Sequence, residues 1–332
     1  MTSRREFIQT TAVAGAMAGN ANAQTSDVPR KPLGKTGLSV SALGVGGFHL
    51  GTADDDATAT RIVHMAIDAG INFFDNAWEY HDGLSEERLG NALVGKRGNV
   101  VLMTKVCTHG RDKNLAMRML EESLRRLRTD HLDVWQIHEV VYDNDPDLIF
   151  GPNGVIEALD AAKKQGKVRF AGFTGHKDPD IHLKMLSHNY PFDTVQMPLN
   201  ILDSTYARSF EQLVLPEVLK RGMAPLGMKS LGGSGEMIKN GALRVEDALS
   251  YAMSLPVATT ISGMERVEVL QQNLAVARGF KKLTDSEMTD MRNSARAFAA
   301  DGRFELYKTT KKYDGAVGRD QHGFPTVEKL PA

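Results

Sequence analysis

Short apolar runs alternate with helix-like segments along most of the chain. The runs are rich in Val, Ile, Phe and Thr and too short for helices, which is typical of strands buried on both faces. Eight of them occur, at 42–46, 71–77, 100–106, 132–138, 168–175, 194–199, 223–229 and 257–263. The pattern therefore predicts a parallel sheet whose strands are separated by crossover segments.

The intervening segments have the spacing of amphipathic helices. In 113–128, apolar residues recur at intervals of three and four, and 55–69 shows the same period before Gly70. Eight strand–helix repeats predict a (β/α)8 barrel, with a doubly wound open sheet as the alternative. The barrel is favoured because 44–49 reads GVGGFH and lacks the GxGxxG fingerprint of open dinucleotide-binding sheets. A tight hairpin is predicted over 32–40, where it would cap the bottom of the barrel.

Composition narrows the class of protein. The 332 residues are 42% hydrophobic and 24% charged, typical of a globular protein, and we expect one domain over 24–332 with an irregular tail over 303–332. Cys107 is the single cysteine, which excludes an intrachain disulfide and a four-cysteine zinc site. The balance of 40 basic and 41 acidic residues offers no field for nucleic acid. We expect a monomer.

The first 23 residues have the features of an export leader. Arg4 and Arg5 stand before a weakly apolar stretch, Phe7 follows them, and the triplet Ala-Asn-Ala ends at Ala23. This segment resembles a twin-arginine signal, with a disordered tail and a chance arginine pair as the alternative. The resemblance implies cleavage after Ala23 and transport of the folded protein by the twin-arginine export machinery. The protein would be cytoplasmic before export and periplasmic afterwards, with no stable membrane association once the leader is removed.

Four ionisable side chains stand at or just beyond the ends of three consecutive predicted strands. They are Asp75, Tyr80, Lys105 and His138. Since barrel enzymes hold their active sites where strands end, we expect these groups to converge. An ammonium group next to Tyr80 would lower the pKa of its phenol, and Asp75 would hold Lys105 in place. Tyr80 could then protonate a carbonyl oxygen that His138 orients, with hydride from a nicotinamide cofactor.

The same residues lie in recognisable motifs. The stretch FDNAWEY, ending at Tyr80, and the stretch SEERLG at 85–90 resemble the second-strand signature of the aldo-keto reductase family. Thr104-Lys105 and Gln136-Ile137-His138 match the next two signatures, and the similarity runs from about residue 31 to residue 279. It implies a (β/α)8 barrel that reduces aldehydes or ketones with NAD(P)H, or the reverse. Asp75, Tyr80, Lys105 and His138 would be the catalytic tetrad, with Tyr80 as general acid.

The resemblance also implies a cofactor site and a substrate pocket. The cofactor-binding residues would be Gly47, Asp75, Thr174, Gln196, Met228, Lys229, Leu231, Gly263, Arg266, Gln272 and Asn273. The family's Lys-Ser pair for the 2′-phosphate is missing at the adenosine end, but Arg266 could pair with that phosphate. NADP(H) is therefore favoured over NAD(H). Phe48, Trp78 and His138 would line the pocket for a small carbonyl or alcohol substrate.

The sequence pattern is also compatible with two other functions. A regulatory or sensor subunit that binds cofactor with little turnover is the main alternative, and a metal-dependent barrel hydrolase or isomerase is another. His109 and His176 could join His138 around a metal, but no HExxH or similar spacing occurs. We expect no metal, no nucleic acid, and an enzyme.

Overall fold

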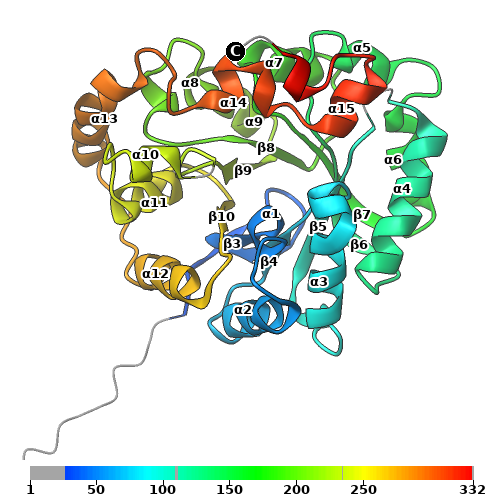
Figure 1. Cartoon of the computed structure of the whole chain (residues 1–332), viewed down its shortest axis with the longest axis horizontal. Helices are drawn as coiled ribbons and strands as arrows, with labels where there is room; N and C mark the ends of the chain where they lie inside the picture. The colour runs from blue at the N-terminus through cyan, green and yellow to red at the C-terminus, as the bar shows by residue number, and fades with distance from the viewer. Residues whose placement is uncertain (1–26, 109–110, 234, 331–332) are drawn as a thin grey trace, which may run out of the picture.

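The computed structural model describes residues 27–108, 111–233 and 235–330, and within them eight parallel strands close into a barrel (Figure 1). The order around the barrel is β10-β3-β4-β5-β6-β7-β8-β9. The strands are β3 (Leu43–Gly46), β4 (Phe73–Asp75), β5 (Val101–Val106), β6 (Leu132–Ile137), β7 (Val168–Thr174), β8 (Thr194–Pro198), β9 (Ala224–Met228) and β10 (Thr259–Gly263). Each lies inside one of the eight predicted runs. The predicted barrel is confirmed and the open sheet is excluded.

Helices pack around the outside of the barrel in the expected alternation (Figure 1). They are α1 (Gly47–Leu50), α2 (Asp56–Asp68), α3 (Leu84–Ala92), α4 (Lys113–Arg126), α5 (Asp145–Phe150), α6 (Val155–Lys164), α7 (Pro179–Ser187), α8 (Phe210–Leu213), α9 (Leu215–Lys220), α10 (Glu236–Lys239), α11 (Val245–Ser254), α12 (Val267–Arg278) and α13 (Asp285–Ala299). Short 3-10 turns are η1 (Tyr80–Gly83), η2 (Arg97–Asn99) and η3 (Asp203–Thr205). No helix among the residues described here is both long enough and apolar enough to cross a membrane.

Local sequence explains where these helices start and stop, as α2 illustrates. The carboxylate of Asp55 accepts a hydrogen bond from the backbone N–H of Thr58 at 2.7 Å, so it satisfies a donor that the first turn leaves without a partner. Ile62 and Ala66 lie on the buried face. The chain leaves the helix at Gly70, whose φ of +90° favours glycine.

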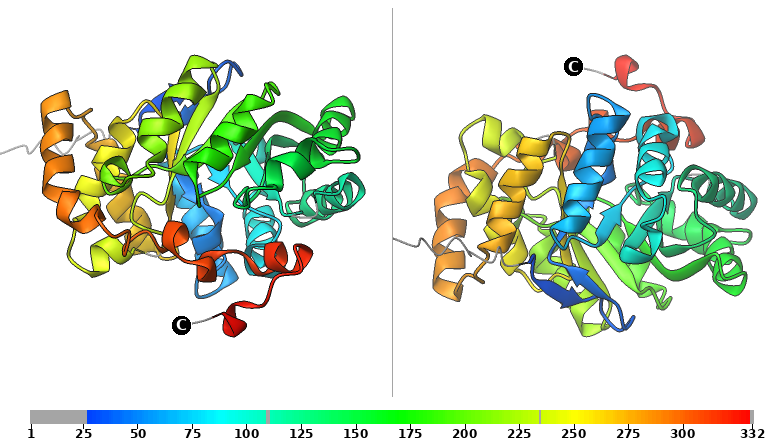
Figure 2. Two further views of the ribbon diagram at one scale, coloured as in Figure 1. Left: turned by 90° about the horizontal axis from the view of Figure 1, so that it is seen from above. Right: turned by 90° about the horizontal axis from the view of Figure 1, so that it is seen from below.

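The predicted hairpin closes the amino end of the barrel. Strands β1 (Arg30–Pro32) and β2 (Ser39–Ser41) pair antiparallel. Leu33 and Val40, from the turn and from β2, are buried in one apolar cluster with barrel residues such as Phe73 and Met103. Figure 2 shows this dark blue hairpin at the end of the barrel opposite the red C-terminal segment. The carboxyl ends of the strands are therefore left for the active site and the tail.

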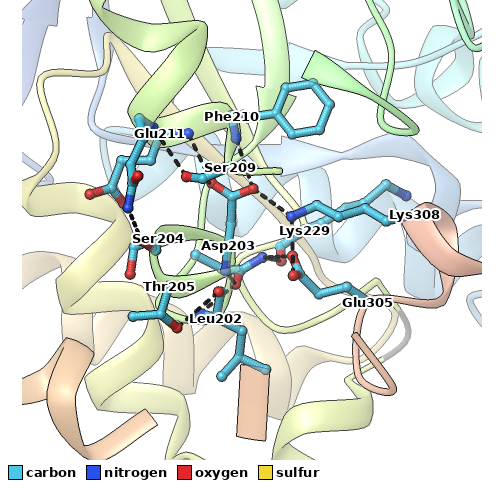
Figure 3. Close-up of polar contacts among 12 residues, drawn as sticks. Leu202, Asp203, Ser204, Thr205, Ser209, Phe210, Glu211, Lys229, Glu305 and Lys308 are labelled. Atoms are coloured by element: carbon cyan, nitrogen blue, oxygen red, sulfur yellow. Dashed lines mark hydrogen bonds and ion pairs between the residues drawn. The ribbon is translucent and has the colours of Figure 1, made fainter. Parts of the chain in front are cut away.

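The C-terminal segment folds into short helices and turns, where the sequence predicted an irregular tail. They are α14 (Leu306–Thr309), η4 (Lys311–Tyr313), α15 (Ala316–Gln321) and η5 (Val327–Lys329). Buried charges anchor the segment: Lys308 contacts Asp203 at 2.5 Å and Glu305 at 3.1 Å (Figure 3). Farther along, Asp314 pairs with Lys177 at 2.6 Å. The segment is thus fixed to loops at the carboxyl end of the barrel.

Candidate active site

The four predicted catalytic side chains meet at the carboxyl ends of β4, β5 and β6. Lys105, in β5, forms a buried ion pair with Asp75, the last residue of β4. The same ammonium donates to the backbone carbonyl of Asn76 at 2.7 Å and to the phenol oxygen of Tyr80 at 3.3 Å. Tyr80 opens η1, and the rings of Tyr80 and His138 meet edge to face at 5.5 Å between centroids. The predicted convergence of the four groups is therefore observed.

The electrostatics of this cluster differ from the expectation in one respect. Burial raises the pKa of the Tyr80 phenol well above its ordinary value, and the carboxylates of Asp75 and Glu79 raise it further. The prediction that Lys105 lowers this pKa is wrong, because desolvation and negative charge outweigh the ammonium. The phenol is therefore protonated near neutral pH. It thus carries the proton that a general acid donates.

Burial also acts on the lysine of the cluster. The Lys105 side chain is 1% exposed, and its desolvation lowers the pKa of the ammonium, while Asp75 opposes that change. The amide of Gln196 donates to the other oxygen of Asp75 at 3.4 Å. Asp75 thus contacts both Lys105 in β5 and Gln196 in β8.

Glu79 is a site residue that the sequence analysis missed. One carboxylate oxygen lies 2.6 Å from Nδ1 of His138, and the other accepts from the Cys107 thiol at 2.7 Å. The available signal was an acidic residue directly before Tyr80 in a loop of otherwise small and aromatic residues. That signal was weak, because nothing in the local pattern shows that Glu79 turns inward.

The SEERLG motif at 85–90 forms hydrogen bonds to the loop after β3 and to β5. The Ser85 hydroxyl donates to the backbone carbonyl of Gly47 at 2.6 Å, and Glu86 accepts from Thr104 at 2.6 Å. Arg88 donates to the backbone carbonyl of Gly51 at 2.8 Å. These contacts hold the loop after β3 against the loop after β4, so the motif positions the site without contacting its reacting groups.

Polar groups at the ends of β7 and β8 fit a nicotinamide carboxamide. Oε1 of Gln196, in β8, is buried and has no hydrogen-bond partner among the described residues. The hydroxyl of Thr174 lies 4.0 Å from the sulfur of Met228, the last residue of β9. A carboxamide offers an N–H donor, which matches the unpartnered Gln196 oxygen, and a carbonyl acceptor, which matches the Thr174 hydroxyl. The residues present therefore fit the predicted cofactor.

Lys229 lies where the chain leaves β9, with a φ of +57°. Its ammonium sits over the rings of Tyr307 and Tyr313, at 5.0 and 4.8 Å from their centroids. Burial lowers the pKa of Lys229 to about 8. Half-buried Leu231 follows it. Both tyrosines belong to the C-terminal segment, so the tail helps to position this cation.

Two predicted cofactor glycines lie where the backbone approaches a neighbour closely. A Cβ added to Gly47 would lie 2.5 Å from the backbone oxygen of Asp75, and one added to Gly263 would lie 2.2 Å from Nδ1 of His49. Gly47 follows β3 and Gly263 ends β10, which are neighbours in the barrel. A larger residue at Gly47 would clash with the backbone at the end of β4, and one at Gly263 would displace the His49 side chain.

Gln272 and Asn273, both predicted to contact the adenosine part of the cofactor, differ in burial. Asn273 is buried, donates to the Ser262 hydroxyl at 3.1 Å, and leaves its Oδ1 without a protein partner. Gln272 is exposed and faces a surface groove between α11 and α12. Arg266 is also exposed, and its guanidinium lies 3.6 Å from the carboxylate of Glu265. The structure thus brings Asn273 to the end of β10 but turns Gln272 away.

The predicted pocket aromatics also differ from one another. Phe48 is 47% exposed and contacts the Tyr80 ring edge to face at 5.4 Å. Trp78 is held by α4: its indole N–H donates to Glu122 at 2.7 Å, and its ring lies 5.3 Å from the Arg126 guanidinium carbon. Phe48 is therefore the aromatic side chain that adjoins the phenol.

Of the two other histidines considered for a metal, only His176 lies in the part of the chain that the structure describes, and it is not in a group of potential ligands with His138 there. His109 lies outside the described residues. His176 is buried beside the rings of Tyr307 and Tyr313, both at 6.0 Å, and burial lowers its pKa well below the ordinary value. A neutral, buried imidazole in aromatic surroundings is typical of a packing role.

Comparisons with known proteins agree with this arrangement. The model of the Aldo/keto reductase family matches residues 42–241. The Bacillus subtilis oxidoreductase YqkF is 26% identical over 309 residues, which are 80% of this chain and 96% of that protein. The 6-dehydroglucose reductase of Novosphingobium aromaticivorans is 31% identical over 229 residues, covering 63% and 72%. The holo structure of the aldo-keto reductase AKR11C1 from Bacillus halodurans superposes with a TM-score of 0.70 at 25% identity, covering 84% and 99%.

A parallel barrel with Tyr, Lys, Asp and His gathered at its carboxyl end defines a class of oxidoreductases that use a nicotinamide cofactor. The chain belongs to the aldo/keto reductase family. It is an NAD(P)H-dependent oxidoreductase rather than a regulatory subunit alone.

Proposed function

We propose that this protein reduces a small aldehyde or ketone to the alcohol with NADP(H), and that Tyr80 is the general acid. The observation that carries the proposal is the buried chain of contacts from Asp75 through the Lys105 ammonium to the Tyr80 phenol, 3.3 Å from that ammonium. When bound, the reduced nicotinamide supplies hydride to the carbonyl carbon. Tyr80 gives its proton to the oxygen, and Lys105 fixes the phenol and stabilises the negative charge that it acquires. His138 orients the carbonyl.

The cofactor would lie along the carboxyl ends of β7 to β10 and β3. Thr174 and Gln196 would hold the carboxamide, and Met228 would pack on the nicotinamide ring. Lys229 and Leu231 would approach the pyrophosphate, with Gly47 and Gly263 allowing close backbone contact, and Asn273 would bind the adenine. The exposed guanidinium of Arg266 supports the preference for NADP(H), because it can turn from Glu265 to a 2′-phosphate.

The substrate we propose is small and polar. Relatives include proteins named 6-dehydroglucose reductase, L-galactose dehydrogenase and methylglyoxal reductase, all of which concern small oxygen-rich carbonyls or alcohols. The mouth combines the partly exposed Phe48 ring with Tyr80 and His138. The Phe48 ring would then lie beside Tyr80 and His138, the two side chains proposed to contact the carbonyl oxygen.

Steady-state kinetics with a panel of aldehydes, ketones and oxidised sugars tests this function. We expect nicotinamide oxidation with at least one carbonyl class, and a higher kcat/KM with NADPH than with NADH. Tight NADPH binding without turnover on any member of the panel would contradict the proposed reaction. Higher kcat/KM with NADH would contradict the cofactor preference alone.

We further propose that residues 1–23 direct export through the twin-arginine machinery, with cleavage after Ala23. The paired Arg4 and Arg5, the Phe7 that follows them and the Ala-Asn-Ala triplet that ends at Ala23 support this. The protein would fold and bind cofactor in the cytoplasm and act in the periplasm as a monomer without stable membrane association. Intact-mass analysis of the periplasmic fraction tests this. Replacement of both arginines by lysine should retain the full-length chain in the cytoplasm, and an unchanged distribution would contradict the proposal.

A further inference from the structure

Three potential metal-ligating side chains come together beside the proposed general acid. Glu79 lies in the loop after β4, Cys107 directly follows β5, and His138 directly follows β6. One ligand atom from each residue can be chosen so that all three lie within 4.8 Å of one another. The three positions are far apart in sequence and match no metal-binding motif, so the cluster exists only because neighbouring parallel strands end at the same edge of the barrel.

The geometry of the cluster centres on the Glu79 carboxylate. Its two oxygens face different partners, Nδ1 of His138 at 2.6 Å and Sγ of Cys107 at 2.7 Å. Cys107 is fully buried and His138 is nearly so. A thiol, an imidazole and a carboxylate that lie side by side offer the ligand types that bind zinc in proteins. Three protein ligands with an open fourth position are typical of accessible zinc sites.

We propose that Glu79, Cys107 and His138 bind a thiophilic divalent cation of the Zn²⁺ class, and that this binding inhibits the reductase. Zn²⁺ would form a bond to the sulfur as the thiol proton leaves to solvent, with no change of oxidation state. The inhibitory part rests on the proposed function, because the cation would dictate the orientation of the His138 ring that orients the carbonyl.

The single cysteine makes the binding test unambiguous. Titration with Co²⁺, a spectroscopic substitute for Zn²⁺, should give a thiolate-to-cobalt charge-transfer band. Only Cys107 can supply that thiolate, because the chain has one cysteine. Cys107→Ser should abolish the band and weaken Zn²⁺ affinity, measured by calorimetry, by at least ~100-fold. His64→Gln on α2 is the matched control and should leave both unchanged, since His64 lies outside the cluster and its ring contacts the backbone oxygen of Ala92 at 2.9 Å.

The two parts of the proposal can fail separately. Absence of the charge-transfer band, or equal Zn²⁺ affinity in wild type and Cys107→Ser, would overturn the cation site whatever the enzyme reduces. Circular dichroism confirms that the serine variant is folded. If carbonyl reduction is observed, Zn²⁺ should inhibit wild type and His64→Gln but not Cys107→Ser. Cation binding that leaves turnover unchanged would overturn the inhibitory part alone.

Discussion

The candidate catalytic cluster and the proposed adenosine end of the cofactor site differ in how far their side chains are exposed. In the cluster, the Lys105 and Asp75 side chains are 1% and 5% exposed, and Lys105 contacts three groups. At the adenosine end, the Arg266 side chain is 62% exposed and pairs with Glu265 at 3.6 Å. Proton transfer needs reacting atoms held in one geometry, and the buried Lys105 and Asp75 at the strand ends hold the phenol of Tyr80 from the following loop. Charge recognition of a phosphate tolerates a flexible side chain at a helix start.

The largest expected effect lies in the rigid region. Tyr80→Phe removes the proton donor while keeping the ring that packs against Phe48 and His138. We expect the reduction rate to fall by ~10²- to 10⁴-fold, because general acid catalysis contributes about that much. Cofactor affinity, measured by fluorescence titration, should stay within a few-fold of wild type. A Tyr80→Phe enzyme with normal kcat would show that another group is the acid.

The C-terminal segment extends the comparison to stability. Lys308 is buried between Asp203 and Glu305, so Lys308→Met would leave two buried carboxylates without their cation (Figure 3). We expect a loss of ~3–5 kcal/mol in the free energy of unfolding, measured by denaturant titration. Lys311→Met, at an exposed position in the same segment, should change stability by less than about 0.5 kcal/mol. Equal stabilities for the two variants would show that the buried cluster does not anchor the tail.

A smaller and more selective effect is expected in the exposed region. Arg266→Ala should weaken NADPH binding by ~10-fold, about 1.4 kcal/mol, and leave NADH binding unchanged, because only NADPH carries the 2′-phosphate. Glu265→Gln is the matched control, since it removes the carboxylate that competes for the guanidinium and should not weaken NADPH binding. Equal losses for both cofactors after Arg266→Ala would place the arginine elsewhere than at the 2′-phosphate.

The smallest expected effect is a dependence of cofactor affinity on pH, caused by the titration of Lys229. Burial lowers the pKa of this ammonium to about 8, so its charge is complete below that pH and is lost as pH rises through it. The charged form attracts the pyrophosphate, so cofactor affinity should fall a few-fold from about pH 7 to about pH 9. Titrations of Lys229→Met should show a flatter profile. A wild-type affinity that rises over this range would contradict the proposed contact.

Some of the site was predictable because its residues are fixed by local pattern. Asp75 and Lys105 stand in short apolar runs whose strand character depends on neighbouring residues, and barrel topology then brings their ends together. The different surroundings of Gln272 and Asn273, one exposed and one buried, could not be predicted from the local pattern. Gln272 adjoins Asn273 in sequence, but consecutive residues of a helix point about 100° apart, so only one of them can face β10.

The sequence by itself determined the eight strands, the hairpin and the convergence of four catalytic side chains, since all of these follow from periodicity and from the rule that parallel strands end together. Only the tertiary structure decided the raised pKa of Tyr80, the inward position of Glu79 between Cys107 and His138, and the tail that anchors through Lys308. Each of these depends on how far water is excluded and on distances between residues remote along the chain. The local sequence pattern predicts neither the exclusion of water nor the distances between residues that are far apart along the chain.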